Sequence, residues 1–207
     1  MLTKPAAADH PIHALLRDRW SPRAFEARPI PAAQLLSLLE AARWSPSGGN
    51  GQPWSFIVVP REDAEAFGRL TSTLNEGNLI WARHAPLLIL ALARTVRDNG
   101  APNAYALYDL GQAVAHMSVQ ASALGLAVHQ MGGFSQEQAR AAFDIPAEYQ
   151  PVTVIAIGEV GDVNGLPETL RDRERAPRVR KPLSDFVFGQ SWGQPLDLVA
   201  ERAVSGD

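Results

Sequence analysis

Cysteine is absent from the 207-residue sequence, and this absence excludes several kinds of site. The chain cannot form a disulfide, bind a metal through thiolates, use a cysteine nucleophile or pass electrons through a dithiol pair. Any redox chemistry that the protein performs therefore needs a bound cofactor.

Long apolar runs and an excess of charge are also absent. The longest apolar run, residues 85–93, is far shorter than the ~20 residues that cross a bilayer. The formal net charge is -3, so bulk charge does not indicate a nucleic-acid-binding protein. The first residues lack an apolar segment of signal-peptide length. We therefore expect a cytoplasmic protein that binds neither nucleic acid nor membrane.

The common catalytic and metal-binding signatures are missing as well. The sequence contains no G-x-G-x-x-G, no G-x-x-x-x-G-K-S/T and no G-x-S-x-G. His10 and His13 are close in sequence but lack the further ligands that a zinc site needs, so we interpret them as surface or cap residues. His84, His116 and His129 occur singly, and a core or surface role is the simpler interpretation for each. No metal site is predicted.

Apolar periodicity predicts an α+β fold. Helices are expected from Asp9 to about Arg17, after Pro31, over 61–74, over 105–124 and after Ser135. Buried strands are expected at 54–59, 86–93, 126–131 and 151–157. We expect one domain over residues 1–207, with a core from about 10 to 187 and a sheet with helices on both faces.

Two features indicate a homodimer. The helix at 105–124 is rich in small residues, which would let another helix approach closely. The stretch 168–181 is highly charged without an apolar period, and the tail beyond it cannot bury itself. We expect an extended C-terminal arm from about 166 to 207 that wraps over the body or over a partner subunit.

A glycine-rich stretch precedes the first expected strand. Residues 45–54 read SPSGGNGQPW and expose bare backbone, as if a ligand must lie against it. Two basic clusters accompany it. Residues 19–23, RWSPR, would suit an anion such as a phosphate, or form a solvated turn. Residues 178–181, RVRK, would by themselves be a solvated face.

Four separated segments together form a familiar pattern. Residues 19–25 have the form R-x-S-x-R-x-F, and residues 45–54 contain P-S-x-x-N-x-Q-P-W. Residues 124–126 (LGL) lead to 131–134 (MGGF), and residues 180–183 read RKPL. In order and spacing these segments resemble the nitroreductase family of flavin-dependent oxidoreductases. The stretch at 45–54 is the most specific of the four.

The resemblance implies a nitroreductase-like fold with a central mixed, mostly antiparallel sheet. It also implies a homodimer with tightly bound, non-covalent FMN at the subunit interface. NADH or NADPH would reduce the flavin, and nitroaromatics, quinones or similar acceptors would reoxidise it by ping-pong hydride transfer through N5. Arg23 would act as an electrostatic stabiliser, with no other catalytic side chain. The matching flavin contacts are Arg19, Trp20 (through its main chain), Ser21 and Arg23; Pro46, Ser47, Gly48 and Asn50 from the partner subunit; Met131, Gly132 and Gly133 along the N5 edge; and Arg178 and Arg180 on the phosphate.

Departures from the family pattern leave alternatives open. Residues 158–160 read GEV where Gly-Tyr-Pro is commoner, and Ser-Gly-Gly replaces Ser-Ser-x at 47–49, which removes one hydroxyl. The polar insertion at 95–104 is short, so any lid is modest. A reductive dehalogenase-like or flavin-fragmenting relative is the first alternative. A flavin-binding or flavin-storage protein without enzymatic activity is the second, and a dimeric scaffold without a ligand is the third.

Overall fold

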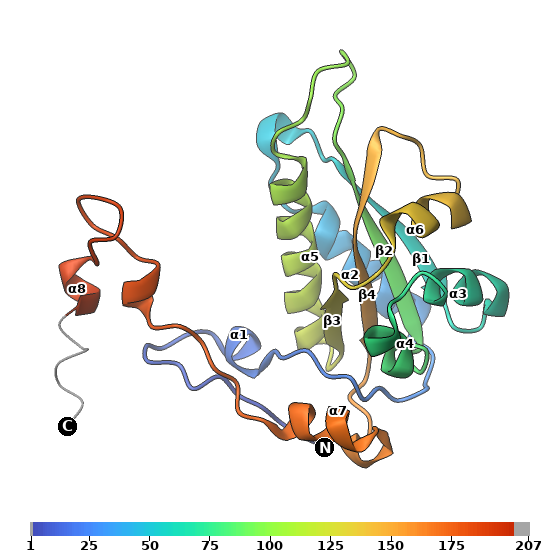
Figure 1. Ribbon diagram of the computed structural model, residues 1–207, viewed down its shortest axis with the longest axis horizontal. Helices are drawn as coiled ribbons and strands as arrows, with labels where there is room; N and C mark the ends of the chain where they lie inside the picture. The colour runs from blue at the N-terminus through green and yellow to red at the C-terminus, as the bar shows by residue number, and fades with distance from the viewer. Residues whose placement is uncertain (1, 201–207) are drawn as a thin grey trace. The chain divides into compact units, whose positions relative to one another are not determined.

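The computed structural model describes residues 2–200 and separates into two compact units (Figure 1). The first unit is Met1–Ala176 and the second is Pro177–Asp207. The first unit holds the sheet, most of the helices and the predicted flavin contacts at 19–23. The single domain with a C-terminal arm stays a prediction.

The first unit is built on a four-stranded sheet in the order β1-β2-β4-β3. We expected a mixed, mostly antiparallel sheet, and each of its three strand pairings is antiparallel. In the register, Ile89 of β2 lies opposite Val58 of β1 and Ile155 of β4. The strands are β1 (Trp54–Pro60), β2 (Leu87–Arg94), β3 (Ala127–Met131) and β4 (Tyr149–Gly158).

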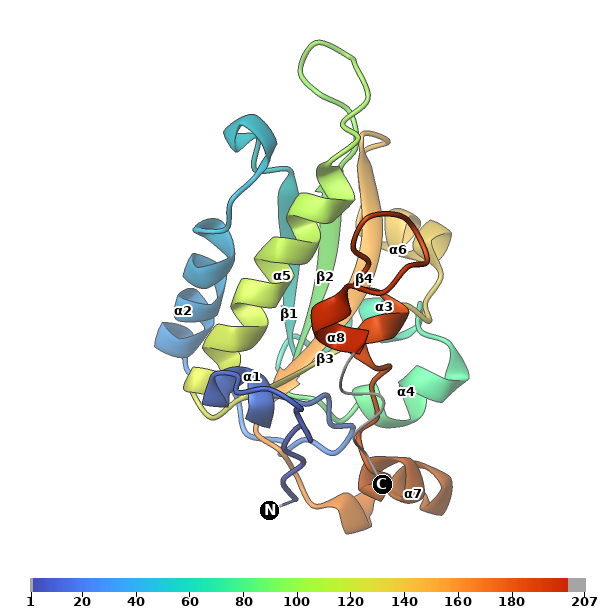
Figure 2. The same ribbon diagram turned by 90° about the vertical axis from the view of Figure 1, so that its left-hand side faces the viewer.

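Helices cover both faces of this sheet, as expected (Figures 1 and 2). One face carries α2 (Ala32–Arg43) and α5 (Ala106–Ala123), and the other carries α3 (Ala64–Thr71), α4 (Glu76–Ala82) and α6 (Gln136–Ala142). Because successive side chains of a strand point to opposite faces, β2 contributes to two hydrophobic cores. Leu88 and Leu90 pack on the α3 side, while Leu87 and Ile89 pack on the α5 side.

Several local sequence signals have the expected effect. Pro31 directly precedes α2, as expected from its fixed φ. Gly125 ends α5 with a φ of 74°, a conformation that glycine adopts without a steric penalty. The Ser135 hydroxyl accepts a hydrogen bond from the Gln138 amide and caps α6.

Three helical segments differ from expectation. The first helix does not begin at Asp9: α1 is Ala14–Asp18, because the His13 imidazole caps it through the Leu15 amide. The sequence did not indicate α4. The charged stretch at 168–181 contains α7 (Glu168–Arg175), which buries Leu170 and Glu174 on one face. The sequence shows no apolar period here because Glu174, one of the two buried positions, carries a carboxylate.

The remaining elements are short. Three 3-10 turns, η1 (Gly48–Asn50), η2 (Val163–Gly165) and η3 (Leu183–Asp185), lie in loops, and α8 (Asp197–Ala200) belongs to the second unit. In the second unit the rings of Phe188 and Trp192 pack at 4.9 Å, although Trp192 stays largely exposed. Among residues 2–200, no helix combines the length and hydrophobicity needed to cross a bilayer.

The segment after α1 crosses the chain beyond β4 at very close range. Phe25 forms an antiparallel bridge with Val160, and the Gly161 amide donates to the Ala24 carbonyl at 2.9 Å. A Cβ atom at Gly161 would lie 2.7 Å from the carbonyl carbon of Phe25. Only glycine therefore allows this crossing, which fixes the main chain directly after Arg23.

Replacing Gly161 with alanine is expected to destabilise the first unit by about 1–3 kcal/mol, because the new methyl group meets rigid backbone. Gly68→Ala is the matched control, since a Cβ there meets nothing within 4 Å in the middle of α3. That change is expected to stabilise the protein by about 0.5–1 kcal/mol through helix propensity. Urea unfolding of both variants measures the difference, and equal stability of the two would contradict the close crossing.

Candidate functional site

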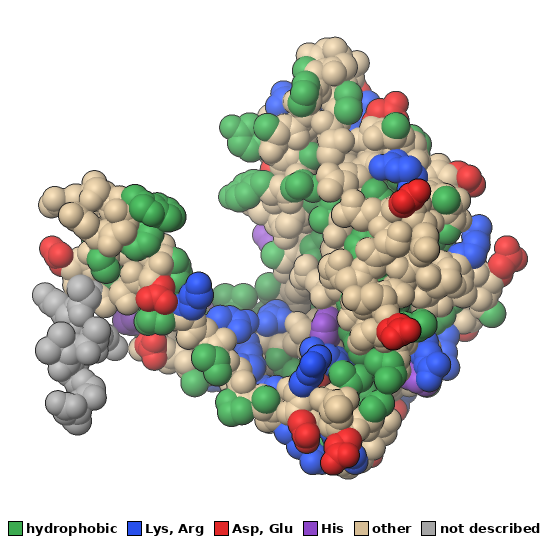
Figure 3. Space-filling model, in the orientation of Figure 1, with side chains coloured by type: hydrophobic (Ala, Val, Ile, Leu, Met, Phe, Trp, Pro, Cys, Tyr) green, Lys and Arg blue, Asp and Glu red, His purple; other side chains and the backbone are tan. Residues whose placement is uncertain are grey.

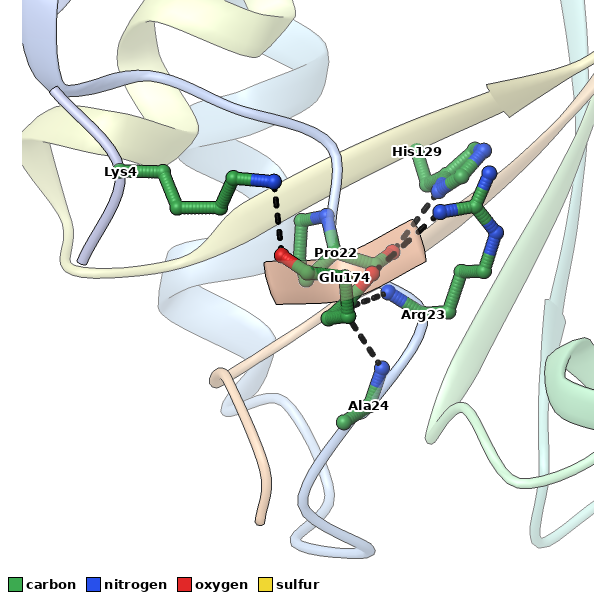
Figure 4. Close-up of polar contacts among 6 residues, drawn as sticks. All are labelled: Lys4, Pro22, Arg23, Ala24, His129 and Glu174. Atoms are coloured by element: carbon green, nitrogen blue, oxygen red, sulfur yellow. Dashed lines mark hydrogen bonds and ion pairs between the residues drawn. The ribbon is translucent and has the colours of Figure 1, made fainter. Parts of the chain in front are cut away.

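The main chain of residues 22–24 is held by two side chains from distant parts of the sequence (Figure 4). Glu174 of α7 accepts hydrogen bonds from the Arg23 amide at 2.6 Å and from the Ala24 amide at 3.3 Å. His129 of β3 contacts the Pro22 carbonyl oxygen at 2.8 Å. The backbone that carries Arg23 is therefore fixed on both sides of its Cα atom.

The Arg23 guanidinium is held by the same carboxylate. Its Nη1 lies 3.3 Å from Glu174 Oε2. The Glu174 side chain is only 1% exposed, whereas that of Arg23 is 26% exposed. The ion pair thus has a buried anion and a cation that reaches the surface. Sequence reasoning missed Glu174, because nothing in a run of charged residues marks which one is buried.

His129 is a neutral imidazole in this environment. A carbonyl oxygen only accepts hydrogen bonds, so Nδ1 carries the proton that is donated to Pro22. The ring packs on Trp81 with centroids 4.5 Å apart. Burial lowers the pKa of His129 to about 4; the hydrogen bond to Pro22 opposes the shift, and the charge of Arg23 adds to it.

The neutral state of His129 makes stability depend on pH. The unfolded chain binds a proton near the usual pKa of 6.5, but the folded chain does so only near 4, so stability is full above 6.5 and falls as the pH drops towards 4. The loss between about pH 6.5 and pH 5 is expected to be about 1.5 kcal/mol. His129→Asn keeps a donor for the Pro22 carbonyl oxygen but has no imidazole to protonate. Its free energy of unfolding, measured with urea, should therefore fall by about 1.5 kcal/mol less than that of the wild type over this pH range. His10→Asn, at an exposed site, serves as the control, and an unchanged pH profile in His129→Asn would count against the neutral imidazole.

The other predicted residues of the first basic cluster lie in the same segment. Arg19 Nη1 lies 3.3 Å from the Ser21 hydroxyl oxygen, so the two side chains act together. The Lys4 ammonium lies 5.3 Å from the centroid of the Trp20 ring and also donates to the main-chain oxygen of Glu174. The Trp20 side chain is therefore engaged by Lys4, and a flavin contact through the Trp20 main chain stays a prediction.

The predicted residues at the end of β3 differ in how closely they are packed, since a Cβ atom at Gly133 would lie 2.3 Å from the Asn75 side-chain nitrogen. The Met131 side chain is buried in the core, and the Thr153 hydroxyl donates to its carbonyl oxygen at 3.0 Å. A Cβ at Gly132 would meet no atom within 4 Å, so the space beside this residue is open. The Gly133 carbonyl accepts from the Asn75 amide and the Asn78 side chain. Because β3 also carries His129, this open backbone and the Arg23 segment belong to one region.

The glycine-rich stretch lies at the opposite end of the first unit. Figure 1 shows η1 beyond the amino-terminal end of α5, while β3 and α1 lie near its carboxy-terminal end. Gly48 donates to Asp109 Oδ2 of α5 at 3.1 Å, and the Gln52 amide donates to the Ser47 hydroxyl. Asn50 has a positive φ of 57°, an uncommon conformation that often marks functional loops. Within one protomer, Pro46, Ser47, Gly48 and Asn50 are thus not brought to Arg23.

Asp109 anchors this loop through the Gly48 amide, so we expect the loop to become more mobile when the Asp109 carboxylate is removed. Asp109→Ala leaves the Gly48 amide without its partner and is expected to cost about 1–3 kcal/mol. Asp109→Asn keeps an amide oxygen as acceptor and should cost less. Hydrogen exchange of the amides of residues 48–52 is expected to speed up in the alanine variant. The same protection in both variants would show that Asp109 does not hold the loop.

Arg178 and Arg180 belong to the second unit. Burial, and next the charge of Arg180, lower the pKa of Arg178. The Arg180 guanidinium donates to the Val179 carbonyl at 2.8 Å. The part of these two residues in the site stays a prediction. Within the described residues, no group of three or more His, Asp or Glu could hold a metal ion.

Comparison with known proteins identifies the family. The model of the nitroreductase family matches residues 16–159 of the chain. The chain belongs to the nitroreductase family. A solved structure described as an oxidoreductase containing FMN is 36% identical, covers 90% of this chain and 96% of its own, and superposes with a TM-score of 0.85. The match confirms the nitroreductase-like α+β fold, and together with the family match it supports a flavin-dependent oxidoreductase.

Two sequence relatives extend this picture. An uncharacterized 15.4 kDa protein of Mycolicibacterium smegmatis is 36% identical over 64% of this chain and 88% of its own length. The 5,6-dimethylbenzimidazole synthase of Rhodospirillum rubrum is 27% identical over 82% of this chain and 93% of its own length. The relatives of this chain thus include a protein whose name describes a synthase.

Proposed function

We propose that the protein is a homodimeric oxidoreductase that binds FMN and takes electrons from NADH or NADPH. The observation that carries this proposal is Arg23, a partly exposed guanidinium on a main chain held by Glu174 and His129. A cation fixed in advance stabilises developing negative charge without reorganisation cost. The family match and the FMN-containing structural neighbour support a flavin as the group that this cation would face.

The residues present fit FMN by their chemistry. The Arg23 guanidinium has five N–H groups, and the ion pair with Glu174 engages one nitrogen, so donors remain for the polar edge of a planar ring. Arg19 and Ser21 add a second guanidinium and a hydroxyl suited to a phosphate or ribityl chain. The open space beside Gly132 admits a ring against bare backbone. Arg178 and Arg180 would bind the phosphate.

When bound, FMN supplies ping-pong hydride transfer from NADH or NADPH to an acceptor such as a nitroaromatic or a quinone. The chain's own residues contribute binding and electrostatics. Arg23 would place a positive charge where reduction adds negative charge to the ring, and the main chain of Gly132 and Gly133 would face its reactive edge. No side chain needs to donate or remove a proton for this role.

The separation of the two predicted site segments supports a dimer. The segment that follows α1 and the loop that contains η1 lie at opposite ends of α5 within one protomer (Figure 1). A second protomer would bring its own loop to the first protomer's Arg23. Figure 3 shows hydrophobic side chains standing out over the upper part of α5, and Tyr105, Leu107 and Tyr108 are all exposed there. Such a patch is typical of an interface.

The proposal predicts that the purified protein is yellow and that NADH or NADPH bleaches its bound flavin under anaerobic stopped flow. Reoxidation by a panel of nitroaromatics and quinones then identifies the acceptor class. Arg23→Ala should keep the fold but lower kcat roughly 100-fold, since a lost preorganised donor costs about 3 kcal/mol. A colourless protein that ignores added FMN contradicts the proposal. Bound flavin that neither nicotinamide bleaches would instead indicate a flavin-storage protein.

Flavin breakdown is a second candidate, because the R. rubrum relative is named 5,6-dimethylbenzimidazole synthase. Dimethylbenzimidazole contains the same dimethyl-substituted benzene ring as the isoalloxazine of FMN. The two functions differ in the fate of the flavin. Aerobic incubation with reduced FMN, followed by mass spectrometry, distinguishes them: a reductase returns FMN intact, and a flavin-fragmenting enzyme releases 5,6-dimethylbenzimidazole.

A further inference from the structure

Glu174 is a buried carboxylate at the centre of the contacts around Arg23 (Figure 4). Its side chain is 1% exposed, and all the donors recorded on it come from residues 23 and 24. Oε1 accepts from two main-chain amides and Oε2 from the Arg23 guanidinium. Burying an ionised carboxylate is costly unless it is paired and hydrogen-bonded. These three donors provide that compensation, and they all belong to the segment that presents Arg23.

The geometry gives Glu174 two separate effects on Arg23. The two amide hydrogen bonds fix the direction in which the main chain presents the side chain. The ion pair at 3.3 Å offsets part of the guanidinium charge, and the offset is strong because the carboxylate is shielded from water. The neighbouring His129 is neutral near pH 7 and hydrogen-bonds Pro22, so it contributes no opposing charge.

We propose that Glu174 is a positioning residue that orients Arg23 and sets how much positive charge Arg23 presents to the bound flavin, and therefore sets the flavin's reduction potential. This inference rests on the proposed function. A more positive environment favours the reduced, more negatively charged ring, so full exposure of the Arg23 charge would raise the potential. Glu174 keeps the potential lower and makes the reduced flavin a stronger electron donor to the acceptor.

The test measures the reduction potential of bound FMN by equilibration with a reference dye. Glu174→Gln keeps an oxygen that can accept from the two amides but removes the charge, so the potential is expected to shift to a more positive value. Asp172→Asn is the matched control, because it removes an exposed carboxylate from the same helix. It should leave the potential at the wild-type value. A wild-type potential in Glu174→Gln overturns the proposal.

A double-mutant cycle separates action through Arg23 from a direct field effect. In an Arg23→Ala background, Glu174→Gln should change the reduction potential little, because the guanidinium whose charge Glu174 offsets is absent. An equal shift in both backgrounds contradicts a role through Arg23. A merely structural role would lower the melting temperature in Glu174→Gln without moving the potential, and that outcome also overturns the proposal.

The same cycle has a readout that needs no flavin. Arg23→Ala leaves the buried carboxylate without its guanidinium and should lower the melting temperature of the flavin-free protein. Adding Glu174→Gln should restore part of that loss, and if Glu174→Gln alone does not fold, this rescue becomes the decisive result. Absence of rescue contradicts the coupling of the two residues. A wild-type protein that binds no FMN but shows the rescue would reject the proposed function while keeping the pairing.

Discussion

The buried carboxylate of Glu174 is the interaction on which the site depends. It joins α7, near the end of the first unit, to the two amides and the guanidinium of residues 23 and 24. An unpaired charge in that position would cost several kcal/mol, so the carboxylate and the Arg23 segment stabilise each other. The contacts that orient Arg23 are therefore formed when the chain folds, and the cation is in place before any ligand binds.

The sheet explains why the site lies where it does. β2 is buried on both faces and leaves no room for a ligand, and the candidate site residues lie outside the interior strands β2 and β4. β3 is an edge strand whose last residues lead to the open backbone at Gly132. At the far end of α5 the Asp109 carboxylate holds the glycine-rich loop. The core thus carries two predicted half-sites, which the proposed homodimer would join.

Several parts of the fold that depend on local chemistry were predictable, although the start of α1 and the whole of α4 were not. The apolar run of β2, the small-residue pattern of α5 and the stop at Gly125 follow from residue type and spacing. The cluster of Arg19, Ser21 and Arg23 was recognisable because its spacing is itself the motif. Glu174 was not, because burial of one carboxylate among many charged residues depends on which helix face packs, and that is decided by contacts distant in sequence. For the same reason the residue-by-residue register of the strands and the contacts of His129 emerged only from the structure.

The most direct test of this account is a crystal structure of the protein with FMN bound. We expect the Arg23 guanidinium to contact the pyrimidine edge of the flavin while Glu174 still accepts from the amides of Arg23 and Ala24, with the glycine-rich loop of a second protomer against the ring. A flavin bound away from residues 19–23, or an Arg23 side chain turned from the ring with its link to Glu174 broken, would contradict it.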